Sequence, residues 1–290
     1  MIVNDTKDIL KEYELFAKKK FGQNFITSSA ILEHIIKVAN ITKDDYVLEI
    51  GPGLGSLTEF LAINAKAVIA YEIDTDMVNI LSKTISKYDN VTIINKDFLD
   101  VDIDLDIDKL FNGANNVKVV ANIPYYITTP ILFKLLGSNK MSDMYFMMQK
   151  ELGQRLSGKP KTKDYNALSV IMNYKSNAKI EFDVPRNFFF PVPNVDSVLL
   201  SVKRKKNDYS LDNEDEFFEF VEALFGMRRK TIVNNLSSSK YHYDKELIKN
   251  CLISLNLKES ARAEELDLDM IIKLYKELRR QKWKLKHMLR

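Results

Sequence analysis

The sequence predicts an α/β protein with a mostly parallel sheet, followed by a small all-helical domain. Short apolar runs alternate with helical patterns over the first half of the chain, and no strand pattern follows residue 215. Between these regions, 178–182 and 195–202 read as two strands with only a loop between them. Alternating strands and helices are typical of a parallel sheet covered on both faces. We therefore expect a first domain over 1–206 and a helical domain over 207–290.

The expected elements follow from the spacing of apolar residues. Short, continuously apolar runs indicate buried parallel strands, and apolar residues three and four apart indicate helices. The expected strands are 46–50, 67–71, 91–94, 117–121 and 144–148, and the expected helices of the first domain are 31–39, 57–64, 77–86 and 130–136. The pair 178–182 and 195–202 predicts an antiparallel hairpin that closes the sheet edge. In the second domain, helical patterns cover 217–225, 228–236, 245–252 and 269–280.

Composition excludes several classes of protein. The 290 residues fit about two domains, and no run of roughly 18 apolar residues predicts a membrane span. The N-terminus lacks the apolar core of a signal peptide. Cys251 is the single cysteine, which excludes an intrachain disulfide and fits a reduced, cytoplasmic setting. The histidines show no metal-ligand spacing, so we expect no metal. Separately, we expect the protein to be a monomer.

The distribution of charge says more than the net charge of +3. Basic runs occupy 18–20 and 203–206, and the last twenty residues hold eight basic residues against one acidic residue. A polarised chain of modest net charge suits a protein that places one positive face on a polyanion such as RNA. The acidic stretch 97–108 lacks the glycine and the terminal glutamate of a calcium-binding loop, so we expect a solvated acidic loop there.

A glycine-rich loop follows the first expected strand. Gly51, Gly53 and Gly55 allow the backbone to turn tightly and to approach a ligand closely. Glu72 ends the second strand, where a carboxylate can accept hydrogen bonds from ribose hydroxyls. Asp97 follows the third strand, where it could accept from an adenine amine. These residues predict a site for a nucleoside-containing cofactor.

Two neighbours of the glycines bear on the choice of cofactor. Pro52 removes a backbone N–H that the pyrophosphate of a dinucleotide would use. Glu49 is better placed beside a cation than beside a pyrophosphate. A sulfonium cofactor carries a positive charge and no phosphate, so the loop favours S-adenosylmethionine over a nicotinamide dinucleotide.

The fourth expected strand runs directly into Asn122-Ile123-Pro124-Tyr125. In an open parallel sheet, ligands bind beyond the carboxyl ends of the strands, so this tetrapeptide should face the cofactor. The Asn122 side-chain oxygen and the Ile123 carbonyl can accept the two N–H bonds of an adenine amine. Tyr125 offers a face for the purine, worth ~1–3 kcal/mol per stacked base, and Pro124 stiffens the turn. The pattern predicts methylation of an amine on a stacked base.

With these stretches in view, the sequence resembles the rRNA adenine N6,N6-dimethyltransferases, specifically the small-subunit type. The resemblance spans almost the whole chain. It rests on the segments 19–26, 48–55, 122–125 and 189–197, and on 225–231 with Asn234-Asn235-Leu236.

The resemblance implies a Rossmann-like S-adenosylmethionine-dependent methyltransferase domain and further site residues. Asn24 and Ile26 would contact the cofactor, and Gly51, Glu72, Asp97 and Asn122 would complete its site. Phe189 would sandwich the target adenine opposite Tyr125, although the run of three phenylalanines at 188–190 leaves the stacking residue open by one position. One departure is Tyr126, where many relatives have asparagine.

The resemblance also implies the substrate and a contact with it. Arg228, Arg229 and Lys230 would contact RNA phosphates, with an affinity that falls as salt rises. The substrate would be two adjacent adenines in a hairpin near the 3′ end of small-subunit rRNA, within an immature small ribosomal subunit. Three alternatives remain: a large-subunit rRNA adenine methyltransferase of the macrolide-resistance type, a non-catalytic ribosome assembly factor, and a nicotinamide oxidoreductase.

Overall fold

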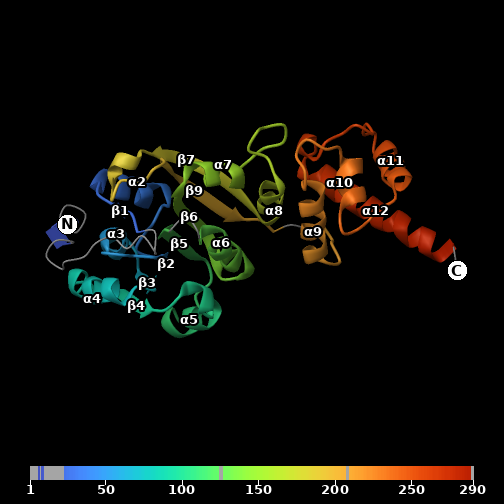
Figure 1. The fold of residues 1–290 in the computed structure, drawn as a ribbon. Helices are drawn as coiled ribbons and strands as arrows, with labels where there is room; N and C mark the ends of the chain where they lie inside the picture. Colours follow the sequence, from blue (N-terminus) through green and yellow to red (C-terminus); the bar gives the residue numbers. More distant parts are fainter. Residues whose placement is uncertain (1–5, 7, 10–22, 124–126, 207–208, 289–290) are drawn as a thin grey trace. The chain divides into compact units, whose positions relative to one another are not determined.

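A computed structural model describes residues 6, 8–9, 23–123, 127–206 and 209–288, with side chains described as far as residue 283 (Figure 1). Pro124, Tyr125 and Tyr126 lie outside the described residues, as does the basic run 18–20. Contacts divide the chain into two compact units. The first comprises Met1–Gly153 and Ala178–Arg204, and the second comprises Gln154–Asn177 and Lys205–Arg290.

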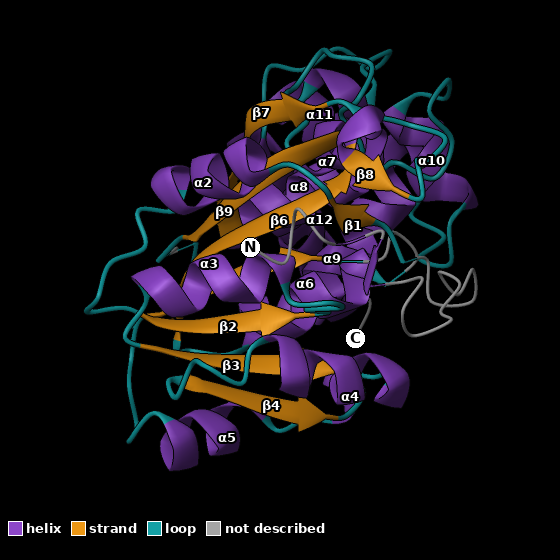
Figure 2. Cartoon of the chain, turned by 90° about the vertical axis from the view of Figure 1, so that its left-hand side faces the viewer, coloured by secondary structure: helices purple, strands orange, loops and turns teal. Residues whose placement is uncertain are grey.

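A seven-stranded sheet forms the centre of the first unit, in the order β4-β3-β2-β5-β6-β9-β7 (Figure 2). The strands from β4 to β6 are parallel, and β9 pairs antiparallel with β6. The predicted parallel sheet with an antiparallel edge is therefore confirmed. The strand bounds are β2 Tyr46–Ile50, β3 Ala67–Glu72, β4 Val91–Asn95, β5 Val117–Asn122, β6 Met141–Gln149, β7 Ser176–Val184 and β9 Ser197–Arg204.

The strand order creates a crevice at one edge of the sheet. The chain winds outward from β2 to β3 and β4, then returns to place β5 on the other side of β2. Ligands of open α/β sheets bind beyond the carboxyl ends of the strands at such a reversal. The carboxyl ends of β2, β3 and β5 carry the glycine loop, Glu72 and Asn122.

Helices α2 (Ser29–Val38) and α3 (Ser56–Asn64) pack on one face of this sheet. Leu32, Ile35 and Ile36 are the buried residues of α2, and their helical spacing forms its apolar stripe. They join a hydrophobic cluster with strand residues such as Val47 and Val120. Two further helices of the unit are α4 (Thr75–Thr84), which contacts β3 and β4, and α6 (Thr128–Gly137), which contacts β6.

Two short strands that contain phenylalanine form a small second sheet that the sequence did not predict. Strands β1 (Phe25–Ile26) and β8 (Phe189–Phe190) pair antiparallel, with Ile26 opposite Phe189. A short 3₁₀ turn, η3 (Arg186–Phe188), precedes β8. Two-residue strands leave no periodic pattern, so their pairing depends on tertiary contacts alone. The pairing joins the segment before α2 to the loop before β9.

The expected solvated acidic loop at 97–108 is wrong. The structure has a 3₁₀ turn, η2 (Phe98–Asp100), and a helix, α5 (Ile103–Leu110). Asp102 caps α5 by accepting from the Leu105 N–H at 3.0 Å, and Ile103 and Ile107 are buried one turn apart. Aspartate is a preferred N-cap residue, so part of the acidic character marks a helix start.

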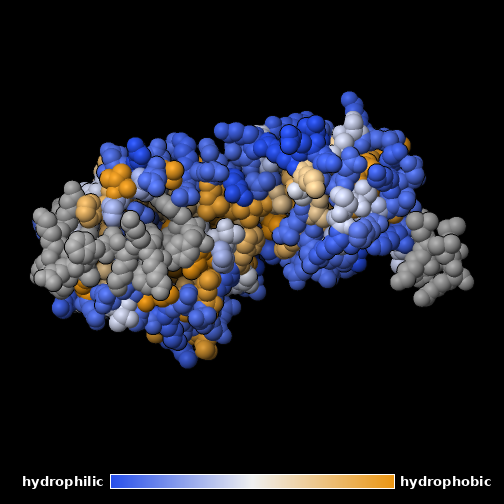
Figure 3. Space-filling model, in the orientation of Figure 1, coloured by the Kyte–Doolittle hydropathy of each residue, from blue (hydrophilic) through white to orange (hydrophobic). Residues whose placement is uncertain are grey.

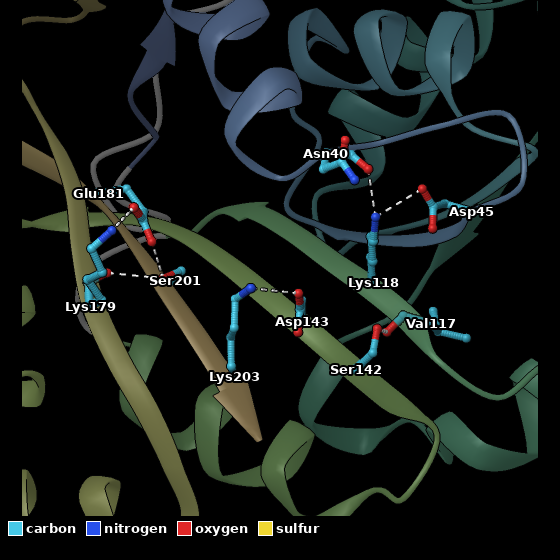
Figure 4. A network of polar contacts seen from close by, with 10 residues as sticks. All are labelled: Asn40, Asp45, Val117, Lys118, Ser142, Asp143, Lys179, Glu181, Ser201 and Lys203. Carbon is cyan, nitrogen blue, oxygen red and sulfur yellow. Dashed lines mark hydrogen bonds and ion pairs between the residues drawn. The ribbon is translucent and has the colours of Figure 1, made fainter. Parts of the chain in front are cut away.

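A row of opposite charges crosses the exposed part of the sheet (Figure 4). Lys118 on β5 donates to Asp45 at 3.0 Å, and Lys203 on β9 lies 3.3 Å from Asp143 on β6. On β7, Glu181 accepts from Ser201 at 2.6 Å. Opposite charges on neighbouring strands stabilise a sheet by ~0.2–1 kcal/mol per pair. Of these contacts, the pair of Lys203 with Asp143 joins the antiparallel edge to the parallel part of the sheet.

The second unit is helical, and its described residues after 205 contain no strand. Segment 154–177, which the sequence predicts to lie in the first domain, packs by contact with the helical unit. Tyr165 donates to the Leu266 carbonyl at 2.9 Å, and Tyr174 packs on Phe217. The helices are α7 Lys150–Leu156, which crosses the boundary, α8 Ala167–Lys175, α9 Glu214–Leu224, α10 Ile232–Ser238, α11 Lys245–Ser254, η4 Ala263–Glu265 and α12 Leu268–Met288. No helix among the described residues is long and apolar enough to cross a membrane.

Candidate cofactor and active site

A cavity lies beyond the carboxyl ends of β2, β3 and β5. About 1080 Å³ of space without protein atoms lies within it, and this figure includes solvent at its open mouth. Eight of the predicted site residues line it: Asn24, Ile26, Gly51, Gly53, Glu72, Asp97, Asn122 and Ile123. Gly55 and Phe189 are not among the lining residues.

The glycine loop needs its glycines for two different reasons. Gly53 has φ +57°, and a Cβ there would lie 2.8 Å from the Phe25 ring, so a side chain would be both strained and crowded. Gly55 has φ +94°, and its Cβ would lie 2.7 Å from Leu81 of α4. Gly53 therefore lets β1 approach the loop, whereas Gly55 lets α3 start close to α4. Only Gly53 of these two borders the cavity.

Glu72 fixes the loop through backbone hydrogen bonds. Its carboxylate accepts from the Gly53 N–H at 3.0 Å and from the Asp74 N–H at 2.9 Å. Its side chain is buried, and burial raises the pKa of this carboxyl above its ordinary value. Each carboxylate oxygen can accept more than one hydrogen bond, so Glu72 can hold the loop and still accept from ligand hydroxyls.

The wall beside Asp97 is held in place by residues that sequence reasoning missed. Asp97 accepts from the Leu99 N–H at 2.9 Å, and the Leu99 carbonyl accepts from Lys134 at 2.6 Å. Tyr71, which lines the cavity, donates to Asp106 of α5 at 2.9 Å. These bonds join η2 to α6 and α5 to β3. The signal for these contacts in the sequence is the acidic run itself, which predicts a solvated loop instead.

Three buried polar atoms have no hydrogen-bond partner among the described residues: Glu49 Oε2 on β2, and Ser56 Oγ and Thr58 Oγ1 at the start of α3. Glu49 and Ser56 also line the cavity. Burial, against a lowering contribution from the Thr58 hydroxyl and with a smaller raising contribution from the Glu72 carboxylate, brings the pKa of Glu49 to about 8. A buried carboxyl is stabilised as an anion by a cationic ligand. This end of the cavity therefore fits a ligand that carries positive charge.

We predict that Glu49 makes unfolding strongly dependent on pH. Its pKa is about 8 in the folded protein against an ordinary value of 4.5, so only the folded state keeps the proton between these values. Its contribution to stability is thus fully present below pH 4.5 and is lost as pH rises toward 8. The loss amounts to about 5 kcal/mol. Urea denaturation of Glu49→Gln should show a flatter pH dependence than the natural protein; equal slopes would contradict the assignment.

Asn122 sits at the end of β5 with its amide held in one orientation. Its Nδ2 donates to the backbone carbonyl of Asn24 at 2.9 Å. The side-chain oxygen Oδ1 is therefore the atom left to accept a hydrogen bond from a ligand. Asn24 and Asn122 come from segments 98 residues apart, which the β1–β8 pairing and the β5 strand bring to the same cavity wall. An amide oxygen held in this way can orient the N–H of an incoming amine.

Phe189 is brought near the site by β8, but its ring is covered. It is 2% exposed and belongs to the same hydrophobic cluster as Ile26 and Leu32. Phe188 is partly buried against that cluster, and Phe190 is partly buried against a second cluster around Phe25 and Leu54. Stacking of a base on Phe189 therefore requires that the side chains over its ring move.

The basic residues predicted to contact RNA lie in the second unit and belong to none of its helices. The helix expected from residue 228 begins instead at Ile232, because Thr231 caps it through the Asn234 N–H. Arg228, Arg229 and Lys230 occupy the turn before α10 and are exposed. The expected helical placement of these three residues is wrong.

The fold and the cavity define a Rossmann-like methyltransferase class of protein. The family profile "Ribosomal RNA adenine dimethylase" matches residues 15–279. The chain belongs to this family, whose members are S-adenosylmethionine-dependent methyltransferases. Membership excludes the nicotinamide oxidoreductase alternative.

Curated relatives and solved structures agree with the family. The chain is 46% identical to "Ribosomal RNA small subunit methyltransferase A" of Streptococcus gordonii over 91% of this chain and 92% of that protein. It is 44% identical to the protein of the same name from Oceanobacillus iheyensis, covering 91% of each. A dimethyladenosine transferase from Plasmodium falciparum matches with a TM-score of 0.75 and 26% identity over 88% of this chain and 98% of the other. The 23S rRNA methyltransferase ErmE matches with a TM-score of 0.67 and 25% identity, covering 88% and 99%.

Proposed function

We propose that the protein dimethylates the N6 amines of two adjacent adenines in a hairpin near the 3′ end of small-subunit rRNA, within the immature small ribosomal subunit. The observation that carries this proposal is the anchored amide of Asn122 at the wall of a cavity suited to a cationic nucleoside ligand. The two relatives compared above at 44% and 46% identity are both named as small-subunit enzymes, which supports the choice of rRNA. An rRNA substrate also supports a cytoplasmic location; the monomeric state stays a prediction.

S-adenosylmethionine supplies the electrophilic methyl group when it is bound. We assign the cofactor site to Asn24, Ile26, Gly51, Gly53, Glu72, Asp97 and Asn122. Glu72 would accept from ribose hydroxyls, and the free oxygen of Asp97 would accept from the adenine amine. Glu49, whose buried Oε2 has no hydrogen-bond partner among the described residues, would face the positive charge of the ligand. Gly55 supports this site by letting α3 begin close to α4.

The chemistry needs alignment more than acid–base catalysis. The lone pair of an adenine amine is delocalised into the ring, which makes the amine a poor nucleophile. Asn122 Oδ1 and the Ile123 carbonyl would accept its two N–H bonds and favour a pyramidal nitrogen. Pro124 would stiffen the turn and Tyr125 would stack on the base. The amine becomes acidic once it is methylated, so no base is needed before attack. The rate enhancement then comes mainly from orientation and electrostatics.

Primer extension on both rRNAs of a strain that lacks the gene, with and without the protein restored, tests the choice of substrate. We expect the stop at two adjacent adenines of small-subunit rRNA to appear only with the protein. A stop restored only in large-subunit rRNA would favour the macrolide-resistance type. Restored subunit maturation by Asn122→Ala without any methylation would favour the assembly factor.

We predict that Phe189→Leu raises KM for the RNA and leaves cofactor affinity unchanged, because leucine keeps an apolar group in the cluster but loses the stacking face. Phe188→Leu is the matched control, since its ring packs partly against the same cluster. Steady-state kinetics and thermal unfolding of both variants check this. A larger rise in KM for Phe188→Leu would transfer the stacking role to Phe188.

A further inference from the structure

A lysine-rich loop joins α7 to α8 in the second unit (Figure 1). It carries Lys159, Lys161 and Lys163, and all three are exposed. Neither the cofactor cavity nor the proposed methyl transfer uses this loop. Lysines at alternate positions in an exposed loop most often only face solvent. A functional role for them therefore needs evidence that the loop has a fixed conformation.

The loop is closed on itself by a dense set of contacts. Thr162 Oγ1 donates to the Lys159 carbonyl at 2.7 Å, and Asn166 Nδ2 donates to the Asp164 carbonyl at 2.6 Å. A Cβ on Gly158 would lie 2.7 Å from the Asp164 carbonyl oxygen, so the two ends of the loop approach closely. Lys161 holds φ +66°, a backbone conformation that non-glycine residues rarely adopt. These contacts hold the loop in a defined shape.

The loop is also fastened to the basic turn before α10. Arg228 Nε pairs with Glu264 at 2.8 Å, and Arg228 Nη1 donates to the Lys163 carbonyl at 2.8 Å. The Lys161 N–H donates to the Glu264 carbonyl at 2.8 Å. Arg228 and Glu264 therefore act together as a latch that joins two basic segments separated by more than sixty residues.

The latch leaves five cations exposed on the joined segments: Lys159, Lys161, Lys163, Arg229 and Lys230. No ion pair involving any of these five is present among the described residues. The Glu264 carboxylate, which could neutralise one of them, is occupied by Arg228. In the orientation of Figure 1, the surface over this region is strongly hydrophilic (Figure 3).

We propose that the loop 158–164 and the turn 227–230 form one phosphate-binding surface for the RNA backbone. In this surface Lys159, Lys161 and Lys163 contact phosphates together with Arg229 and Lys230, and Arg228 positions the loop as part of the latch. Several exposed cations on two segments that are held together match the regularly spaced charges of a nucleic-acid backbone. Contacts of this kind bind phosphates and do not distinguish between base sequences. The inference rests on the proposed rRNA substrate.

The test measures binding of immature small subunits as a function of salt, with fluorescently labelled full-length protein. The variant is Lys159→Gln, Lys161→Gln and Lys163→Gln combined. The matched control is Lys109→Gln, Lys245→Gln and Lys273→Gln, which removes the same charge from three other exposed lysines. Each lost phosphate contact lowers the slope of log affinity against log salt by about 0.7–0.9. We expect the loop variant to lose about 2 in slope, and the control to lose little.

Further readouts separate this inference from the proposed function. Both variants should keep the natural melting temperature and S-adenosylmethionine affinity, because no substituted lysine lines the cavity. Equal slopes for the loop variant and the natural protein, or equal losses in variant and control, would overturn the phosphate surface alone. Failure of the natural protein to bind or methylate small subunits would instead overturn the proposed function.

Discussion

Replacing Asn122 with alanine should lower kcat for adenine methylation by about 10²–10³-fold or more, the range seen when one preorganised polar group is removed from an active site. The amide oxygen that should orient the amine is lost, and so is the hydrogen bond from Nδ2 to the Asn24 carbonyl. The fold should persist, because Asn122 lies at the end of β5 and is only partly buried. Single-turnover methyl transfer with saturating S-adenosylmethionine measures the effect.

Asn122→Asp provides the sharper control for the same residue. Aspartate keeps the size of the side chain and an acceptor oxygen, but it has no N–H to donate to the Asn24 carbonyl. The two acceptors would repel each other, so the side chain should rotate and kcat should fall nearly as far as in Asn122→Ala. Natural kcat in both variants would show that Asn122 does not orient the amine.

The second large effect is expected at Glu72. Glu72→Ala removes the acceptor of two buried N–H groups, those of Gly53 and Asp74. Each buried N–H left without a partner costs about 1–3 kcal/mol of stability. The loop that borders the cavity should lose its shape, and S-adenosylmethionine affinity should fall by at least about 100-fold, as ~3 kcal/mol of lost interaction requires. Calorimetry with the cofactor measures this loss.

Two further variants serve as comparisons for Glu72→Ala. Glu72→Gln keeps one acceptor oxygen for the backbone but no charge, so its affinity should lie between those of the natural protein and Glu72→Ala. Glu33→Ala removes an exposed carboxylate from α2 and should change neither affinity nor stability. Unchanged cofactor binding by a folded Glu72→Ala protein would contradict the role given to this carboxylate.

Much of the sheet could be predicted because each parallel strand is a short apolar run that stops where the ligand site begins. Val47 to Ile50 and Val117 to Ala121 are almost fully buried, and such runs need no knowledge of their neighbours. The motif Gly51 to Gly55 follows from local backbone demands in the same way. For that reason, eight predicted site residues do line one cavity.

The failures share a physical cause, which is dependence on distant contacts. Strands β1 and β8 are two residues long, so only their mutual pairing defines them. Segment 154–177 joins the helical unit through Tyr165 and Tyr174, whose partners lie more than thirty residues away in the sequence. The burial of Phe189 in the cluster that includes Ile26 also depends on distant contacts, and its stacking role stays a prediction.

Local competition explains two further errors. The acidic residues at 97–108 have different structural roles. Asp102 caps α5, and Asp106 accepts a tertiary hydrogen bond from Tyr71. Composition cannot distinguish these uses from solvation. Likewise, the apolar spacing from residue 228 is helical, but Thr231 caps the helix and α10 begins only at Ile232. Arg228 therefore lies outside the helix, where it pairs with Glu264.

The central claim is tested most directly by mass spectrometry of rRNA after incubation of immature small subunits with the purified protein and isotopically labelled S-adenosylmethionine. We expect labelled N6,N6-dimethyladenine at two adjacent positions near the 3′ end of small-subunit rRNA, and none with Asn122→Ala. Label confined to large-subunit rRNA in a parallel incubation, or to atoms other than the adenine N6 amines, would contradict it.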